Sequence, residues 1–371
     1  MRKIYVFSDF PSKENPAFHY FIKHRVNVLK KHYDVTVITR KYVEKVVNEF
    51  ECKEMEGYKL VTLYVKDINI PKLNFLYKEC RLKRLLKKYL RKNPPDLIHI
   101  HFSSFYSWLV YGICEKINVP YIITEHASFF EKRINHFYVG PKMKLALNNA
   151  ESVIAVSPYL KKIVEKYTTN PVKVVSNVVD TQKFKLELEE TPNDLIKIIT
   201  IGDLDENDKK GYELLLQALK KAKENGFNFK CEIIGDGPNR KKLQRKIDEY
   251  NLTNVKLVGI VANDLLPKRL NNSSFFVSTS KVETFGVAIV EAMSCGLPVV
   301  ATKSGGPECF VTQEIGLLSE PTVDAVYKNL TQMMTSYNNY NPNIIREKVI
   351  ENFSEKAYLK QIMEIYNKLI R

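Results

Sequence analysis

Long apolar runs are missing from this sequence. The longest candidate, Trp108 to Cys114, falls far short of the roughly 18 consecutive apolar residues that a membrane-spanning helix needs. The apolar run that follows Met1-Arg2-Lys3 is too brief for a signal peptide and ends at Ser8-Asp9, so we expect a first β-strand there. The sequence therefore predicts a chain that does not cross a bilayer.

Closely spaced cysteines are missing as well. The six cysteines are widely scattered and form no CxxC pair, which indicates neither a zinc site nor a disulfide framework. Reduced thiols are typical of a cytoplasmic protein, and we expect that location. Internal repeats and low-complexity tracts are also absent, which excludes a solenoid.

Length and charge indicate two dissimilar halves. At 371 residues the chain exceeds the usual size of one hydrophobic core, so two domains are expected. Residues 1–180 hold 31 Lys and Arg against 17 Asp and Glu, whereas residues 181–371 hold 26 against 25. The basic first half favours an anionic partner such as acidic lipid, a phosphorylated substrate or nucleic acid. Nucleic acid is the weakest of these because no aromatic-interleaved basic patch accompanies the charge.

Short β-rich runs alternate with amphipathic helical stretches, a pattern typical of βαβ units and a parallel sheet. The strands are expected at 3–8, 35–39, 59–65, 96–101, 120–124, 152–156 and 172–176, and then at 196–202, 229–235, 255–259, 274–278 and 298–302. The restart predicts two doubly wound domains in tandem, with ligands at the carboxyl ends of the strands and a cleft where the domains face each other.

Domain boundaries follow from this pattern. We predict an acceptor-binding domain at 1–184, a polar linker at 185–194 and a donor-binding domain at 195–352. Residues 353–371 should form a helix, capped by Ser354, that docks back on the first domain.

Residues 72–92 form a basic amphipathic segment. Its apolar residues fall on one side, nine Lys and Arg surround them, and Glu79 is the only acid. A solvated face on a helix packed against the sheet is one interpretation, and peripheral contact with an anionic membrane surface is the other.

The most informative stretch is 278–308, which we interpret as strand, loop, helix, strand and loop. Glu283 precedes the helix, and Glu291 lies eight positions further on. The amides of 284–287 fall at the helix amino terminus, where an anion such as a diphosphate is favoured. A carboxylate placed like Glu291 can accept both hydroxyls of a ribose.

This stretch resembles glycosyltransferase family 4, in Glu283-Thr284-Phe285-Gly286 through Glu291-Ala292-Met293, then Gly296-Leu297-Pro298 and Gly305-Gly306. The resemblance implies a GT-B fold of two Rossmann-like domains. It also implies that Glu291 binds the ribose, that Glu283 contacts the donor sugar, and that Phe285, Gly286 and Val287 approach the sugar and phosphates through their backbone.

Other segments look like signatures of the same family. Ile234-Gly235-Asp236-Gly237-Pro238 is one of them, and Gly202 followed by Lys210-Gly211 is another. The resemblance places Val261 near the base and Lys210 on the diphosphate. In the first half, Thr124-Glu125-His126-Ala127-Ser128 matches the segment whose histidine, here His126, faces the transferred sugar.

Two departures from the family pattern concern the phosphates. Asp203 stands where the family often has an Arg, so that charge is missing or comes from Lys209. The first loop, residues 13–18, lacks the glycines that let a backbone approach a diphosphate, and the first glycine in the chain is Gly57.

The resemblance implies a retaining, metal-independent transfer of a hexosyl group from a UDP- or GDP-sugar, with no cofactor beyond this co-substrate. A glycan or lipid-linked acceptor in cell-envelope polysaccharide synthesis is the expected recipient. His99 and His101 share one strand face, but no third metal ligand accompanies them, so we interpret them as sheet residues. A catalytically inert binding or regulatory protein and a nucleotide-sugar epimerase remain alternatives.

Overall fold

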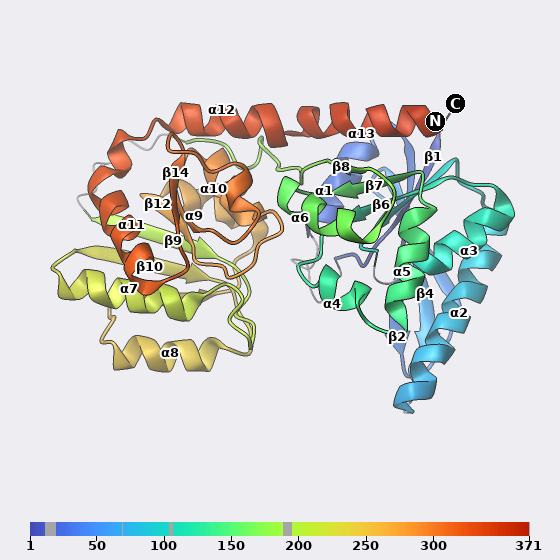
Figure 1. Cartoon of the computed structure of the whole chain (residues 1–371), viewed down its shortest axis with the longest axis horizontal. Helices are drawn as coiled ribbons and strands as arrows, with labels where there is room; N and C mark the ends of the chain where they lie inside the picture. Colours follow the sequence, from blue (N-terminus) through green and yellow to red (C-terminus); the bar gives the residue numbers. More distant parts are fainter. Residues whose placement is uncertain (12–19, 69, 104–106, 188–194, 371) are drawn as a thin grey trace. The chain divides into compact units, whose positions relative to one another are not determined.

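The chain divides into two compact units, which we describe separately (Figure 1). The computed structural model describes residues 1–11, 20–68, 70–103, 107–187 and 195–370. The first unit comprises Met1–Ser176 and Tyr358–Arg371, and the second comprises Asn177–Ala357. The predicted linker at 185–194 lies largely outside the described residues, as does the first loop at 13–18.

The first unit is built on an eight-stranded sheet with the order β3-β4-β2-β1-β5-β6-β7-β8. Its strands are β1 (Lys3–Phe7), β2 (Asp34–Val43), β3 (Phe50–Met55), β4 (Tyr58–Lys66), β5 (Leu97–His101), β6 (Tyr121–Glu125), β7 (Ser152–Ala155) and β8 (Val172–Val174). Its helices are α1 (Tyr20–Leu29), α2 (Pro71–Lys92), α3 (Ser107–Ile117), α4 (Phe130–Ile134), α5 (Val139–Asn148), α6 (Pro158–Val164), the 3₁₀ turn η1 (Glu165–Tyr167) and most of α13 (Glu355–Leu369).

One strand pair departs from the predicted all-parallel sheet. β3, which was not expected, runs antiparallel to β4, with Met55 opposite Tyr58. The two-residue connection contains Gly57, whose φ of 78° lies in the left-handed region that favours glycine. A tight connection of this length can join only antiparallel neighbours, because parallel strands need a long crossover.

The second unit has a six-stranded parallel sheet with the order β11-β10-β9-β12-β13-β14. Its strands are β9 (Ile196–Ile201), β10 (Phe229–Ile234), β11 (Val255–Gly259), β12 (Phe275–Ser278), β13 (Val299–Thr302) and β14 (Gly316–Ser319), of which β14 was not predicted. Its helices are α7 (Tyr212–Glu224), α8 (Arg240–Glu249), α9 (Leu266–Asn271), α10 (Val287–Ser294), α11 (Val323–Ser336) and α12 (Pro342–Phe353), with 3₁₀ turns η2 (Asn263–Leu265), η3 (Pro307–Cys309) and η4 (Tyr337–Asn339).

The strand order of the second sheet fixes where a ligand can bind. β9 lies between β10 and β12, so the chain reverses its direction of travel across the sheet there. The loops that follow β9 and β12 diverge at this switch point, which is the usual ligand position in open α/β sheets. Apolar side chains of α7, α8 and α11 pack with the strands in one buried core. The predicted α/β fold is confirmed.

The carboxyl-terminal helix belongs to the core of the first unit from Tyr358 onward. The Ser354 hydroxyl accepts a hydrogen bond from the amide of Ala357 at 3.2 Å, as expected for a helix cap. The Tyr366 hydroxyl and His99 Nδ1 form a hydrogen bond of 2.6 Å. The fully buried Arg25 guanidinium lies 5.0 Å from the centre of the Tyr358 ring. These polar contacts, together with buried Ile362, join α13 to β5 and α1.

Helix α2 has two different halves. Leu82, Leu85, Leu86 and Leu90 are fully buried, and the helix packs against β4 and α3, so the packed interpretation holds for this half. Towards the amino end Leu73 is 56% and Leu76 47% exposed, whereas Phe75 is half-buried against the Tyr138 ring. Membrane contact by the exposed leucines stays a prediction.

Candidate donor site in the second unit

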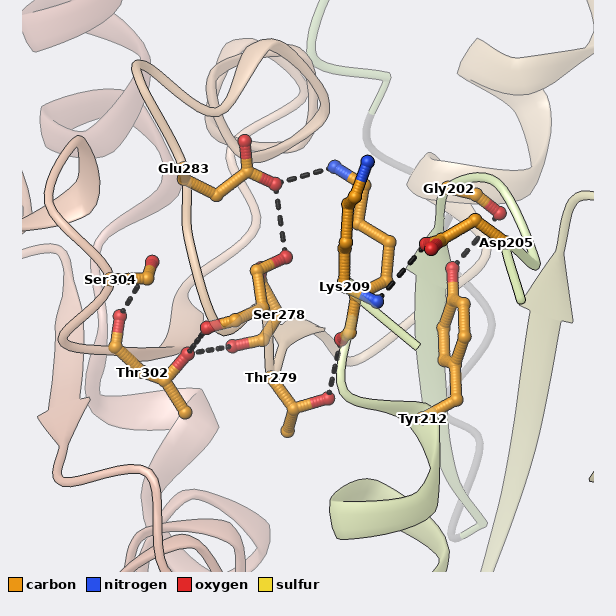
Figure 2. Close-up of polar contacts among 11 residues, drawn as sticks. Gly202, Asp205, Lys209, Tyr212, Ser278, Thr279, Glu283, Thr302 and Ser304 are labelled. Atoms are coloured by element: carbon orange, nitrogen blue, oxygen red, sulfur yellow. Dashed lines mark hydrogen bonds and ion pairs between the residues drawn. The ribbon is translucent and has the colours of Figure 1, made fainter. Parts of the chain in front are cut away.

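The structure brings Lys210 and Glu283 together at the switch point, although 73 positions separate them in the chain. Figure 2 shows Glu283 facing the loop that carries Lys209. Lys210 follows β9, and Glu283 follows β12. The Lys210 Nζ lies 2.5 Å from Glu283 Oε1, and the Ser280 hydroxyl donates to the same oxygen at 2.9 Å. The Glu283 side chain is 14% exposed and that of Lys210 32%, so both remain accessible from solvent.

Asp208 and Gly211 shape the loop that carries Lys210. Both residues have positive φ, and Asp208 caps α7 by accepting the amides of Tyr212 at 2.8 Å and Glu213 at 3.3 Å. A Cβ at Gly211 would lie 1.9 Å from the carbonyl oxygen of Thr279, so only glycine fits. The Thr279 hydroxyl in turn donates to the carbonyls of Lys210 and Gly211. The two loops are thereby tied to each other.

Acidic neighbours keep Lys210 charged. Burial by itself lowers the pKa of its ammonium, but the charge of Glu283, the hydrogen bond to Glu283 and the charges of Asp203 and Asp205 outweigh that effect, so the pKa is raised. Asp203, which stands where the related family often has an Arg, thus acts on Lys210 as a negative charge. An ammonium carries three N–H donors, and Glu283 accepts one of them. Among the described residues no second acceptor of this ammonium is found, so two donors are left for a ligand.

The backbone of Glu283 is held by the loop after β13. Its amide donates to the Ser304 carbonyl at 2.9 Å, and its carbonyl accepts the amide of Gly306 at 2.7 Å. The Glu308 carboxylate accepts the amides of Ser304 and Gly305 and fixes that loop. A Cβ at Gly306 would lie 2.5 Å from the Phe285 carbonyl oxygen, which explains the glycine there.

Gly286 starts α10 in the left-handed conformation, with φ of 98°. The Phe285 ring is buried against Phe310 and Phe353, so the segment is anchored from its apolar side. The first amides of a helix have no partner within it, so Val287 and its neighbours offer donors and the positive end of the helix dipole. The structure places the helix start at Val287, and its use as an anion site stays a prediction.

Glu291 lies in the second turn of α10. It is half-buried, and burial raises the pKa of its carboxyl to about 8, while the nearby Lys183 charge opposes this shift. Within the described part of the chain its carboxylate makes no hydrogen bond to Glu283 or Lys210. Hydrogen bonds donated by a ligand, such as those from ribose hydroxyls, favour the ionised form of this carboxyl and lower its pKa.

The remaining predicted donor residues border the same edge of the sheet. Gly202 follows β9, and its carbonyl accepts the Tyr212 hydroxyl at 3.0 Å. Its added Cβ would lie 3.0 Å from both the Lys210 side chain and the Tyr212 hydroxyl, so the glycine leaves room for Lys210. Lys209 is exposed and its amide donates to Asp205. Val261 is half-buried in the loop after β11.

His126 lies in the first unit, in a buried polar cluster that the sequence did not reveal. His126 Nε2 lies 2.9 Å from His101 Nδ1, and the rings of Phe21 and Phe102 flank it. The adjacent Glu125 accepts the amides of Ser103, His126 and Ala127, although burial raises the pKa of its carboxyl. The alternation of side chains on β5 predicted that His99 and His101 share one face, but nothing local in the sequence indicated that His126, which follows β6, contacts His101.

His99 is a structural residue of the sheet. Its two ring nitrogens meet Tyr366 at 2.6 Å and Thr124 at 2.7 Å, and burial and the charge of Arg25 hold its pKa well below the usual value. Among the described residues, no group of three or more His, Cys, Asp or Glu is arranged to hold a metal ion. None of the described helices combines the length and the apolar character that crossing a bilayer requires.

Family comparisons agree with this geometry. The model of glycosyl transferases group 1 matches residues 179–356, and that of glycosyltransferase family 4 matches residues 21–183. Together they cover both units. The chain belongs to the family 4, group 1 glycosyltransferases and has the GT-B fold.

Individual relatives support the same assignment. An uncharacterised glycosyltransferase of Methanocaldococcus jannaschii is 29% identical over 75% of this chain and 71% of its own length. A phosphatidylinositol N-acetylglucosaminyltransferase subunit of Arabidopsis thaliana is 23% identical over 77% of this chain, which spans 65% of that protein. The structure of Anabaena HepE in complex with UDP and glucose superposes with a TM-score of 0.73 at 18% identity, over 99% of this chain and 100% of that one.

Proposed function

We propose that this glycosyltransferase moves a hexosyl group, with retention of configuration and without a metal ion, from a nucleotide-diphosphate sugar to a glycan or lipid-linked acceptor. The observation that carries the proposal is the Lys210–Glu283 ion pair beside the amino terminus of α10. It gathers a cation, an acid and helix amides at the sheet's switch point. Synthesis of a cell-envelope polysaccharide is the process in which we place the reaction.

A UDP- or GDP-sugar is the proposed donor. HepE, which shares the fold, was crystallised with UDP and glucose, and this favours UDP. In the proposed pose the Glu291 carboxylate accepts the ribose hydroxyls, Val261 borders the base, and the backbone of Phe285, Gly286 and Val287 approaches the sugar and phosphates. A thermal-shift screen with UDP, GDP and ADP tests this assignment, since a ligand at 100 times its dissociation constant adds about 2.7 kcal/mol. Melting temperatures unchanged by every nucleotide would contradict it.

Charge stabilisation carries the proposed chemistry. The bond from the anomeric carbon to the diphosphate oxygen breaks, and the acceptor hydroxyl forms its bond to that carbon from the same face. The proton of the acceptor hydroxyl passes to the leaving phosphate oxygen, so the nucleoside diphosphate leaves carrying that proton. Lys210, with Lys209 beside it, and the amides at the start of α10 stabilise the leaving group. Glu283 contacts the donor sugar and positions the Lys210 ammonium, and His126 is assigned a contact with the transferred sugar.

The mechanism is tested by incubating the protein with each donor and an acceptor glycan and identifying the product by NMR. We expect an α-linked product from an α-linked donor, at an unchanged rate in EDTA. Inversion at the anomeric carbon refutes retention, and loss of activity in the chelator refutes the metal-free chemistry.

The same assay separates the alternatives. Asp203, which replaces an expected Arg and adds negative charge near Lys210, favours a protein that binds the nucleotide sugar without turning it over. Binding without any product identifies such an inert protein. A donor converted to its epimer in the absence of acceptor identifies an epimerase.

An acceptor at a membrane surface would explain the exposed apolar side chains at the amino end of α2. Ile70, Leu73 and Leu76 point outwards among the basic side chains of this helix. An amphipathic helix with such a face binds anionic lipid by apolar burial and charge together. The Arabidopsis relative, named for transfer to phosphatidylinositol, favours a lipid-linked acceptor.

Vesicle sedimentation tests the membrane proposal. We expect the protein to pellet with anionic vesicles at low salt, and expect the Leu73→Ser/Leu76→Ser double variant to lose at least about half of this binding. Ile350→Ser, which removes a comparably exposed side chain from α12, is the matched control. Absence of binding at low ionic strength ends the idea.

A further inference from the structure

One face of the second sheet is left open beside α9. Along β10 the side chains alternate, with Phe229 and Cys231 in the core shared with α7 and α8, and Lys230 exposed on the other side. β11 alternates in the same way around exposed Lys256. Strands covered by helices on both faces are normally continuous apolar runs, so this alternation marks a face that meets solvent.

A pocket of about 860 Å³ lies on this face. Its described lining includes five cationic side chains, Lys197, Lys230, Lys256, Lys268 and Arg269, and one acid, Glu232. The strands supply the first three cations and α9 the other two. We call this cavity the basic pocket.

The charge of the basic pocket differs from that of its surroundings. The second unit, Asn177–Ala357, holds 23 Lys and Arg against 25 Asp and Glu, a net charge of −2. The basic excess of the protein therefore comes from the first unit and does not explain five cations around one acid here. The fold of the second unit therefore concentrates positive charge at the basic pocket, although the unit as a whole is slightly acidic.

Packing makes this concentration costly. Lys197 on β9 and Lys230 on β10 are register partners on neighbouring strands and point to the same face, where like charges destabilise a sheet. The one acid is already engaged, because Arg269 donates to Glu232 at 2.7 Å. Protection of a sheet edge explains a lysine on the edge strand β11, but β9 is an interior strand. A bound anion would relieve the repulsion between Lys197 and Lys230.

The basic pocket is separate from the donor site. Lys197 stands at the amino end of β9, whereas Gly202, beside Lys210, follows its carboxyl end. Five residues of extended strand correspond to about 16 Å. An anion in the basic pocket and a diphosphate at Lys210 would therefore occupy opposite edges of the sheet.

We propose that the basic pocket is a second anion site that binds an oligophosphate, either a free small molecule or the headgroup of an anionic lipid. Lysine ammonium groups are mobile point charges that suit clustered phosphate oxygens, and two adjacent phosphates match the Lys197–Lys230 pair. The volume lies within the range of small-molecule sites in proteins.

Calorimetric titration with inorganic pyrophosphate tests the proposal. The titrations use the full chain in a Lys210→Ala background, which removes the proposed donor-site cation, so the outcome does not depend on the proposed function. We expect pyrophosphate to bind at low ionic strength and the added Lys197→Ala/Lys230→Ala pair to weaken binding at least 10-fold. Lys241→Ala, an exposed lysine on α8 outside the lining, should leave affinity unchanged.

Stability keeps this test interpretable. Because the Lys197→Ala/Lys230→Ala pair removes the repulsion between the two lysines, the melting temperature of this variant should equal or exceed that of the parent, so lost binding will not reflect unfolding. Pyrophosphate affinity that is undetectable, or equal with and without the two lysines, overturns the proposal.

Vesicles distinguish the two sources of phosphate. Sedimentation with vesicles that contain phosphatidylinositol 4,5-bisphosphate, if lost in the Lys197→Ala/Lys230→Ala variant, identifies a lipid headgroup. Pyrophosphate binding that depends on these lysines, with sedimentation that does not, identifies a free oligophosphate. If neither pyrophosphate binding nor vesicle sedimentation depends on the two lysines, both the free oligophosphate and the lipid headgroup are refuted as ligands.

Discussion

Nucleotide binding should release a proton from Glu291. Its half-buried carboxyl has a pKa raised to about 8 by burial, so about nine-tenths of the molecules carry the proton at pH 7. Ribose hydroxyls donate hydrogen bonds, which favour the ionised form and lower this pKa. Binding of UDP at pH 7 should therefore expel close to one proton per site.

The pH dependence of affinity follows from the same value. If only the carboxylate binds well, protonation weakens apparent affinity by a factor of about 11 at pH 7 and about 2 at pH 8. UDP should then bind about five-fold more tightly at pH 8 than at pH 7, close to 1 kcal/mol.

Calorimetry in two buffers with different ionisation enthalpies measures the proton release directly. Glu291→Gln cannot release this proton, and it also corrects for titration of the nucleotide. We expect the variant to bind with a nearly flat profile between pH 7 and pH 9. Equal proton release in the variant and the parent, or proton uptake by the parent, would refute the assigned state of Glu291.

Three further outcomes are expected. Between the ordinary pKa of a glutamate and the raised pKa of about 8, the folded state keeps the Glu291 proton and the unfolded state does not. The free energy of unfolding should therefore fall as pH rises through that range. Glu291→Gln should gain at least about 2 °C in melting temperature over the parent at pH 8 and little at pH 4. Gly211→Ala should destabilise the second unit by more than about 2 kcal/mol in urea titration, because of its φ of 67° and the clash with Thr279, whereas Gly226→Ala, with open space around it, should cost less. Tyr366→Phe removes the hydroxyl bonded to His99 and should cost about 1–2 kcal/mol in the same assay, and an unchanged midpoint would contradict that role.

The parallel strands were predictable because their apolar runs alternate with helices at regular spacing. β3 escaped prediction because its sequence, Phe50–Met55, is polar and exposed, and only pairing with β4 makes it a strand. β14 escaped prediction because its sequence, Gly-Leu-Leu-Ser, contains no β-branched or aromatic residue and so gives little strand signal. In α2 the pattern gave the helix and its basic character, but not that Leu73 and Leu76 stay exposed while Phe75 packs against Tyr138.

The candidate site was predicted in parts. Local sequence placed Glu283 before a helix and Glu291 within it, yet the contact between Glu283 and Lys210 depends on the order of the strands, which spacing along the chain does not encode. Asp208 carried a recognisable signal, since an acid just before a helix is a common cap. The Ser280 and Glu308 contacts each lie within a single loop, and no recognisable sequence motif indicated them.

The catalytic efficiency of Lys210→Ala with a UDP- or GDP-sugar tests the central claim most directly, with Lys241→Ala as a control and melting curves to confirm folding. Loss of a charge that stabilises the leaving diphosphate should lower kcat/KM at least about 100-fold while the fold survives. A folded Lys210→Ala protein that transfers sugar at the parent rate would contradict the account.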